Sequence, residues 1–516
     1  MTAPPIVPEK LWATFPVAAQ AIIVALWERN QQLEARVAQF EAEVADLKAK
    51  LNRTSSNSSL PPSANPLHAK PAPPKSKSGK RRGGQVGHAK HERPQLPPDD
   101  IQHRKPDFCR ACQHPLVGDD SDPLVHQVFE VPKIKPEVIE YRRHRLTCPK
   151  SGTTTCGVLP VGTESGYGPR AEATVAYFGG ALRASKRATS AAMDDLFGLP
   201  ISPAAVCARQ AATAQVLAPI AAEALDHVRA QPAANIDETS WDRCKTKSES
   251  KSKSTVESKS TVESKSNVES KSESNSKSTF KSESKSKSWL WVLVTPFVTA
   301  FLIRPKRNRE AFDDLVGPKS PILTSDRFSV YDHLDPAKRQ VCWAHLIRDF
   351  QAMIDRQNAG SEVGEELLAM ADILFEHWPK FRDGTMTRET FQTLYLPELR
   401  TEVHALLESG QAAACPKTAA TCREILVVEE SLWTFARVKG VEPTNNAAER
   451  ALRHAVCWRK TSHGTQSEAG RRFVEHILTT VATYRQQGRN VLAFLTDAVQ
   501  AVRNSDNRSS LLPVGV

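Results

Sequence analysis

The chain has 516 residues, a formal net charge of +11 and a pI near 9.1. This length allows several domains, and the basic balance favours a polyanionic partner. The most apolar stretch, residues 289–303, is too short to span a bilayer, and the N-terminus lacks the pattern of a signal peptide. Ten cysteines in this length fit a reducing compartment better than a disulfide framework.

Residues 19–51 carry apolar side chains at alternating spacings of three and four, the heptad repeat of a coiled coil. These apolar positions are Ile23, Leu26, Leu33, Val37, Phe40, Val44, Leu47 and Leu51. Asn30 falls at an a position of this repeat. In a parallel dimer, each charged residue at a g position of one chain would meet an opposite charge at an e position of the other. The pairs are Arg29 with Glu34, Arg36 with Glu41, and Glu43 with Lys48. We expect residues 1–53 to form a parallel homodimer; the alternative is one amphipathic helix packed on the rest of the chain.

Residues 54–107 are rich in Ser, Pro, Gly and Lys and lack apolar periodicity, so a solvated linker is expected. Its basic side chains favour contact with a phosphate backbone irrespective of base sequence. They are Lys75, Lys77, Lys80, Arg81 and Arg82.

Four cysteines lie within residues 108–165. Cys109 and Cys112 have the spacing of a zinc knuckle, whereas seven residues separate Cys148 from Cys156. We expect a small domain with a structural Zn²⁺ held by these four thiolates. The alternatives are a site that uses His114 or His144, or a domain folded by its apolar residues with free thiols.

The next segment, residues 166–230, has a helical pattern. Within it, residues 194–209 read as helix, glycine turn and second helix. This pattern indicates either a helix-turn-helix that reads DNA or an Ala-rich structural helix pair.

Residues 245–288 are almost wholly Ser, Lys and Glu in short tandem repeats, so we expect a disordered and passive insertion. It separates a strand carrying Asp237 from two paired strands around Thr295 and Pro296. Further along we expect a helix over 308–316, a strand over 321–325 ending at Asp326, a helix over 339–354, helices throughout 362–438, and terminal helices over 468–485 and 490–502.

Three acidic residues stand out: Asp237 and Asp326 end short apolar runs, and Glu449 opens an amphipathic helix. This order of elements matches a ribonuclease-H-like core, and carboxylates are the ligands that Mg²⁺ takes. Glu238 or Asp242 could replace Asp237, and Asp332 could replace Asp326. Glu449 has a structural alternative as the third helical residue of a capping box begun by Asn446.

The chain resembles the insertion sequence 66 family of bacterial DDE transposases over nearly its full length. Beyond the heptad and cysteine segments, the resemblance is carried by Ser-Ser-Asn-Ser-Ser-Leu-Pro-Pro-Ser, Lys-Arg-Arg-Gly-Gly-Gln-Val-Gly-His, Asp-Glu-Thr-Ser-Trp, Ser-Asp-Arg-Phe-Ser-Val-Tyr-Asp, Cys-Trp-Ala-His-Leu-Ile-Arg-Asp-Phe and Asn-Asn-Ala-Ala-Glu-Arg-Ala-Leu-Arg. It implies that Asp237, Asp326 and Glu449 are a catalytic triad holding two Mg²⁺ (or Mn²⁺) ions, for strand cleavage and transfer on DNA.

The resemblance implies a multidomain α/β protein with a ribonuclease-H-like core over 231–465, a helical insertion over 360–440 and C-terminal helices over 466–516. Arg450 and Arg453 are candidate DNA contacts. Cys342, His345 and Arg348 match a segment of the family whose function the sequence does not indicate. The structural alternative is that Cys342 is a buried thiol and His345 a hydrogen-bonded histidine without a direct role at the site.

The expected partners are terminal inverted repeats, target DNA, a second copy of the chain and accessory proteins of the same element, in the bacterial cytoplasm at the nucleoid and without a membrane. Two alternatives stay open. One is a catalytically dead or domesticated copy, and the other is a zinc-containing DNA-binding regulator.

Overall fold

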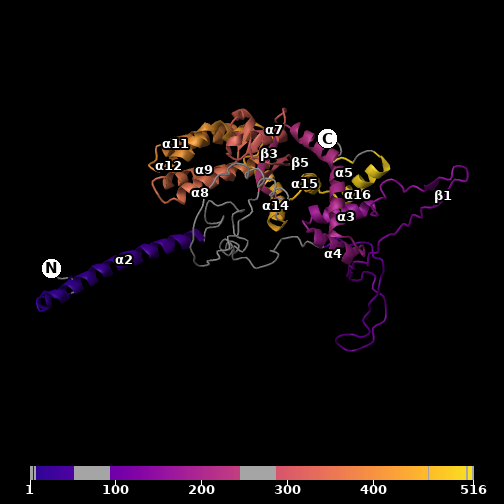
Figure 1. Cartoon of the computed structure of the whole chain (residues 1–516), viewed down its shortest axis with the longest axis horizontal. Helices are drawn as coiled ribbons and strands as arrows, with labels where there is room; N and C mark the ends of the chain where they lie inside the picture. The colour runs from indigo at the N-terminus through magenta and orange to yellow at the C-terminus, as the bar shows by residue number, and fades with distance from the viewer. Residues whose placement is uncertain are drawn as a thin grey trace, which may run out of the picture. The chain divides into compact units, whose positions relative to one another are not determined.

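The computed structural model describes residues 4, 7–51, 93–243, 286–462, 464–506 and 509–513 (Figure 1). The chain divides into two units, one of residues 71–157 and 190–202 and the other of the remaining segments. Among the described helices, none combines the length and the apolar character that a membrane crossing needs.

A long N-terminal helix covers the heptad repeat. The short α1 (Glu9–Trp12) precedes α2 (Val17–Leu51), which is one uninterrupted helix of 35 residues. Its apolar heptad side chains are exposed at Leu26, Leu33, Val37, Phe40, Val44 and Leu47. Pairing with a second copy stays a prediction.

The smaller unit contains one hairpin, in which β1 (Arg145–Thr147) pairs antiparallel with β2 (Thr154–Cys156). Nearly all side chains of residues 93–157 are exposed. A segment with so few buried apolar groups lacks the core that would hold it together by hydrophobic burial.

Three helices precede the sheet, as the helical pattern of residues 166–230 predicted: α3 (Pro169–Gly180), α4 (Lys186–Phe197) and α5 (Pro203–Arg229). Arg209, in the first turns of α5, donates to Glu172 of α3 at 2.7 Å. Glu172 also pairs with Arg503. Arg209 therefore helps to join helices, and DNA reading by this segment remains a prediction.

The larger unit is built around a mixed five-stranded sheet in the order β5-β4-β3-β6-β7. The strands are β3 (Ala233–Arg243), β4 (Ser286–Val294), β5 (Thr299–Arg304), β6 (Ile322–Ser325) and β7 (Arg339–Val341). β4 runs antiparallel to both neighbours, whereas β6 and β7 run parallel to β3. The chain is thus a mixed α/β protein, with β3 at the centre of the sheet.

Helices cover both faces of this sheet. α14 (Asn446–Ser462) lies on the face that carries Asp237, Thr239 and Trp241, since Trp458 of α14 contacts the Trp241 ring edge-on at 6.1 Å. α7 (Arg309–Val316) lies on the side of Glu238, because its Phe312 contacts the ring of Tyr331, whose hydroxyl donates to Glu238. Residues 290–294 of β4 are all buried, as expected for a strand covered on both sides.

Helix α15 (Glu468–Gln486) closes the open edge of the sheet. The backbone N–H groups of Thr299, Phe301 and Ile303 in β5 donate to side chains of α15: the hydroxyls of Thr483 and Thr479 and the carboxylate of Glu475. These bonds satisfy donors that an edge strand would otherwise expose. With α16 (Val491–Asn504), α15 shares the sheet's hydrophobic core, so the boundary expected at residue 466 is not a break in packing.

Two local expectations were wrong. Residues 339–354 were expected to be one helix, but residues 339–341 form β7 and α8 begins afterwards (Trp343–Ile354). This strand was not predicted because two of its residues, Arg339 and Gln340, are polar although their side chains are buried, so the segment lacks the apolar pattern of a buried strand. The repeat insertion was expected to reach Ser288, but β4 begins at Ser286, where it pairs with Arg243 of β3. The repeat itself lies outside the described residues.

The helical insertion packs into a second hydrophobic core, which it shares with α8 and with Val341 of β7. Its elements are α9 (Ser361–Arg382), α10 (Arg388–Thr390), the π-turn η4 (Phe391–Tyr395), α11 (Leu396–Gln411), α12 (Pro416–Val427), η5 (Glu429–Leu432) and α13 (Thr434–Arg437). Gln340 of β7 fastens it to the sheet, donating to the Leu432 carbonyl at 2.9 Å and accepting from the Phe435 N–H at 2.7 Å.

Candidate functional site

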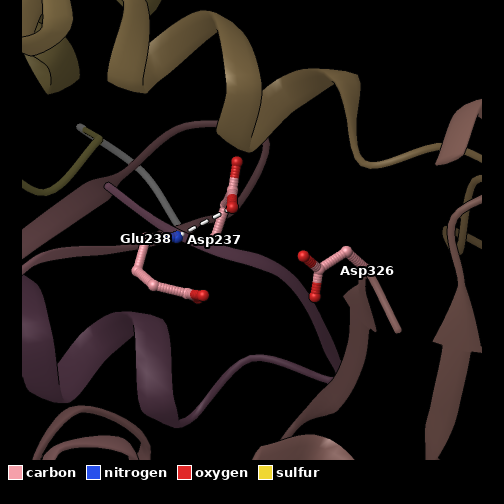
Figure 2. Close-up of side chains that lie close together, drawn as sticks. All are labelled: Asp237, Glu238 and Asp326. Carbon is pink, nitrogen blue, oxygen red and sulfur yellow. Dashed lines mark hydrogen bonds between the residues drawn. The ribbon is translucent and has the colours of Figure 1, made fainter. Parts of the chain in front are cut away.

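Two aspartates meet near the middle of the sheet. Asp237 lies on the central strand β3, and Asp326 directly follows β6, the parallel neighbour of β3. One ligand oxygen from each of Asp237, Glu238 and Asp326 lies within 4.8 Å of the others (Figure 2). The sequence predicted the convergence of Asp237 and Asp326, because parallel strands bring the ends of their apolar runs to the same part of a sheet.

Glu238 belongs to this group by distance, but its carboxylate is already engaged. Figure 2 shows it leaving β3 on the side opposite to Asp237. One oxygen accepts from Arg307 Nε at 2.6 Å, and the other accepts from the Tyr331 hydroxyl. The Arg307 guanidinium in turn stacks on the Phe328 ring, 3.5 Å from its centroid. We therefore interpret Glu238 as a buried structural brace rather than a free cation ligand.

The carboxyl of Asp237 is in an environment that disfavours its charge. Burial raises its pKa well above the usual range, and the nearby charges of Glu238, Asp326 and Glu449 raise it further. One Asp237 oxygen accepts from the Glu238 N–H at 2.8 Å, which opposes these effects only in part. A divalent cation would remove this repulsion, so the electrostatics suit a metal site.

Asn445 sets the position of the helix that carries Glu449. Its side chain donates to the Ile236 carbonyl at 2.7 Å and accepts from Asn235 at 3.1 Å, directly before Asp237. At the far end of α14, Arg459 donates to the hydroxyls of Thr239 and Ser240. The helix is therefore fastened to β3 on both sides of Asp237.

The capping box of Asn446 and Glu449, the structural alternative for Glu449, is not formed. Helix α14 begins at Asn446, one residue earlier than that motif requires, so Asn445 is the residue before the helix. The Glu449 carboxylate instead accepts from Arg348 Nη2 of α8 at 3.0 Å, with His345 Nε2 at 3.7 Å. Glu449 lies outside the group within 4.8 Å, although its charge contributes to the raised pKa of Asp237.

Cys342 and His345 lie at the start of α8 and support this arrangement. The buried Cys342 thiol accepts from the Asn445 N–H at 3.0 Å, and burial raises its pKa to about 11. Burial, followed by the charge of Arg348, lowers the pKa of His345. Its Nδ1 is buried and has no hydrogen-bond partner within the described residues. The buried thiol was expected; the unpaired imidazole nitrogen was not.

Residues 274–472 match the family model described as "Transposase IS66 family". This chain therefore carries an IS66 family transposase domain. The matched range contains Asp326, Glu449 and the α8 residues, and Asp237 precedes it.

Two further similarities were found. Residues 13–94, which include α2, match a family of unknown function, DUF6444. The uncharacterized protein y4qI of Sinorhizobium fredii (strain NBRC 101917 / NGR234) is 24% identical over 243 residues. That alignment covers 42% of this chain and 44% of y4qI, so it spans less than half of the relative.

The alternative acids are less well placed than the aspartates of the site. Asp242 is five residues further along β3, about 17 Å away at strand spacing. Asp332 pairs with Arg339 at 3.2 Å. Arg450 and Arg453 are exposed on α14, and Glu449 pairs with Arg348. Lys75, Lys77, Lys80, Arg81 and Arg82 lie outside the described residues.

The four cysteines of the expected zinc domain are free thiols. Cys109 lies close to Cys112, whereas Cys156 is on β2, opposite Arg145 rather than Cys148. The described residues gather no three of these thiols within 4.8 Å of one another. Zinc binding remains a prediction.

Sequence reasoning missed the residues that hold the acids in place. Asn235 and Asn445 fasten α14 to β3, and Arg307 and Tyr331 occupy Glu238. These partners are distant in sequence: Glu238 is 69 residues from Arg307 and 93 from Tyr331. The one available signal was Asn445, a polar residue directly before the helix that carries Glu449.

Proposed function

We propose that this IS66 family member is a DNA transposase in which Asp237, Asp326 and Glu449 hold two Mg²⁺ ions within a ribonuclease-H-like core. The main support is the convergence of Asp237 and Asp326 beside α14, where burial and like charges raise the pKa of Asp237. In a ribonuclease-H-like core the first Asp is mid-sheet and the second ends a neighbouring strand, and both aspartates occupy such positions.

The donor set fits a hard cation. Carboxylate oxygens are the ligands that Mg²⁺ prefers, and Asp237 and Asp326 are not held in ion pairs among the described residues. When bound, a pair of Mg²⁺ ions would activate the attacking hydroxyl and stabilise the leaving oxygen. Within the chain, Asp237 and Asp326 hold the site from the sheet and Glu449 approaches from α14. Arg348 brings a positive charge next to Glu449 for a scissile phosphate.

The DNA contacts are proposed on charge and position. Arg450 and Arg453 are exposed on the helix that bears Glu449, so a strand at the carboxylates would lie within reach of both. Lys80, Arg81 and Arg82 would add phosphate contacts that do not depend on base sequence. Binding to terminal inverted repeats and to target DNA, in the bacterial cytoplasm at the nucleoid, follows from this proposal. Accessory proteins of the same element are proposed partners.

Dimerisation through α2 would bring two element ends together. The exposed apolar heptad positions give each helix a face that a second copy would cover. Asn30, which donates to Glu34 at 2.8 Å within one helix, would lie at the dimer seam. We also propose that the segment of residues 108–165, which contains the four cysteines, binds a structural Zn²⁺.

Strand transfer tests the function directly. The purified chain is incubated with Mg²⁺ and labelled duplexes carrying the DNA ends that flank its gene, and joining to a target duplex is measured. Asp237→Asn and Glu449→Gln should abolish joining and leave DNA binding intact. Asp242→Asn on the same strand and Glu442→Gln on an exposed loop are the matched controls.

The outcome also separates the alternatives. Undiminished joining by either site variant would remove that residue from the mechanism. If the parent chain binds the element ends but joins nothing in Mg²⁺ or Mn²⁺, it is a degenerate copy. Binding at scattered promoters instead of element ends would indicate a regulator.

A further inference from the structure

The backbone around Cys109 is repeated around Cys148. The Cys109 N–H donates to the carbonyl five residues later at 2.8 Å, and its carbonyl accepts from the N–H four residues later at 3.0 Å. For Cys148 the same two bonds, five and four residues ahead, measure 2.9 Å each. The residue four positions after each cysteine has a left-handed backbone, with φ of 58° at Gln113 and 70° at Gly152. The two segments are therefore knuckles of the same geometry.

The surroundings of the two sulfur atoms repeat as well. The Cys109 sulfur accepts hydrogen bonds from the N–H groups of Cys112 and Ala111 and from the Cys112 thiol. The Cys148 sulfur accepts hydrogen bonds from the Ser151 hydroxyl and from the N–H groups of Ser151 and Lys150. Donors two and three residues ahead thus point at the sulfur in both knuckles. Such donors stabilise a thiolate, the form that binds metal.

This correspondence puts Ser151 in the place that Cys112 holds in the first knuckle. Cys156 does not fill that place. It pairs with Arg145 on the β1–β2 ladder, three residues before Cys148, which puts its backbone about 10 Å from the knuckle at strand spacing. The long gap between Cys148 and Cys156 therefore reflects a knuckle with one cysteine replaced, rather than a loose knuckle with two.

We propose that zinc binding in this chain uses three thiolates, Cys109, Cys112 and Cys148, with Ser151 at the fourth corner and Cys156 outside the site. Three thiolates fit Zn²⁺, which takes sulfur ligands in a tetrahedral arrangement. A neutral hydroxyl is a weaker donor than a thiolate, so the fourth position is open to water and the ion exchanges readily. Because the thiols are not gathered among the described residues, binding closes the two knuckles together and releases their protons.

Four versions of the full chain test the ligand set: the parent, Ser151→Cys, Cys156→Ser and Cys148→Ser. Each is stripped of metal, and its zinc affinity is measured by competition with a chromophoric chelator. Co²⁺ substitution then reports the number of thiolates through sulfur-to-cobalt charge-transfer absorption. The carboxylates of the sheet give no such band, so this reading is independent of the proposed transposase site.

Ser151→Cys should tighten zinc binding by about tenfold or more and add one thiolate to the cobalt spectrum. Cys156→Ser should leave both readings unchanged, and Cys148→Ser should weaken binding and remove one thiolate. Ser151 is exposed, so its substitution leaves packing intact. The proposal fails if Cys156→Ser weakens zinc binding as much as Cys148→Ser, if Ser151→Cys changes nothing, or if the parent binds no zinc.

Discussion

Arg348 of α8 donates to Glu449 of α14 at 3.0 Å, so the acid expected to complete the triad is paired with a cation in the protein alone. This pair sets up a competition. A divalent ion at Asp237 and Asp326 would have to share Glu449 with Arg348, and the positive charge of Arg348 opposes a second positive charge nearby. We infer that Arg348 lowers the affinity of the site for cations until DNA phosphate takes over its charge.

Arg348→Ala should therefore tighten Mn²⁺ binding several-fold in the absence of DNA and reduce strand transfer in its presence. Isothermal titration with Mn²⁺ gives the first quantity, and the joining assay gives the second. Arg423→Ala, which removes an equally charged but exposed side chain on α12, is the control. Weaker Mn²⁺ binding by Arg348→Ala would show that Arg348 positions Glu449 rather than competing for it.

The raised pKa of Asp237 gives a prediction about stability and pH. A carboxyl whose pKa is higher in the folded state than in the unfolded chain favours folding at low pH, and this contribution is lost as pH rises through the folded value. At neutral pH without metal, the raised pKa of Asp237 therefore makes this residue oppose folding. Asp237→Asn should raise the melting temperature at about pH 8, by about 2–4 °C for each kcal/mol gained.

The same measurement at lower pH provides the check. The advantage of Asp237→Asn should shrink as pH falls through the raised pKa, and it should vanish below about pH 3.9, where the carboxyl is protonated in both states. In the parent chain Mg²⁺ should supply the stabilisation instead, by binding only the folded protein. An Asp237→Asn variant less stable than the parent at about pH 8 in EDTA would contradict this electrostatic account.

Glu238 is hydrogen-bonded to Arg307 and Tyr331 beside the site, so we expect its substitution to change stability rather than cation binding. Glu238→Gln leaves the Arg307 guanidinium without its counter-charge, at a cost of about 2–3 kcal/mol. This cost is below that of a fully buried pair, since Arg307 is partly exposed. Chemical denaturation should show the loss, while Mn²⁺ affinity stays near that of the parent.

Tyr331→Phe removes only the hydroxyl that donates to Glu238 and keeps the aromatic packing on Phe312. It should destabilise less than Glu238→Gln, by about 1 kcal/mol. If either variant lost Mn²⁺ binding while still folded, Glu238 would be a ligand after all.

The site was predictable from the sequence to the extent that its chemistry lies in short segments. Asp237 and Asp326 each follow an apolar run that reads as a strand, and parallel strands align such ends. β7 was missed because its buried residues include Arg339, whose guanidinium donates to the Tyr331 and Asp326 carbonyls and pairs with the Asp332 carboxylate. Those partners lie in other elements of the fold, so the sequence around Arg339 does not indicate that its side chain is buried.

The position of Glu449 shows a second limit. A shift of one residue at the start of α14 decides between a capping box and a side chain that reaches α8. That shift is fixed by Asn445, whose N–H is bound to Cys342, 103 residues earlier in the chain. Helix ends are least certain where a tertiary contact, rather than local propensity, sets the first residue.

Gly464 allows a test of how closely α14 and β3 must approach. Its φ is +86°, and a Cβ there would collide with the backbone carbonyl of Asp242. Gly440 has a similar φ of +88° with nothing within 4 Å of a built Cβ. Gly440→Ala should cost about 1 kcal/mol from backbone strain alone.

Gly464→Ala should cost clearly more than Gly440→Ala, because the collision adds to the strain and moves the end of α14 from β3. Denaturant unfolding of the two variants measures the difference, and strand transfer should fall only for Gly464→Ala. Equal costs for both glycines would mean that this end of α14 is free to shift.

Leu33 provides the test of the proposed dimer. Its side chain is exposed at a d position of α2, so we expect it to be buried against a second copy of the helix in the dimer. Leu33→Asp places two like charges in the seam and should convert the chain to a monomer, as read by analytical ultracentrifugation. Ala35→Asp, at the outward f position of the same heptad, carries the same charge and should remain dimeric. A parent chain that sediments as a monomer would instead leave the heptad face to a different partner.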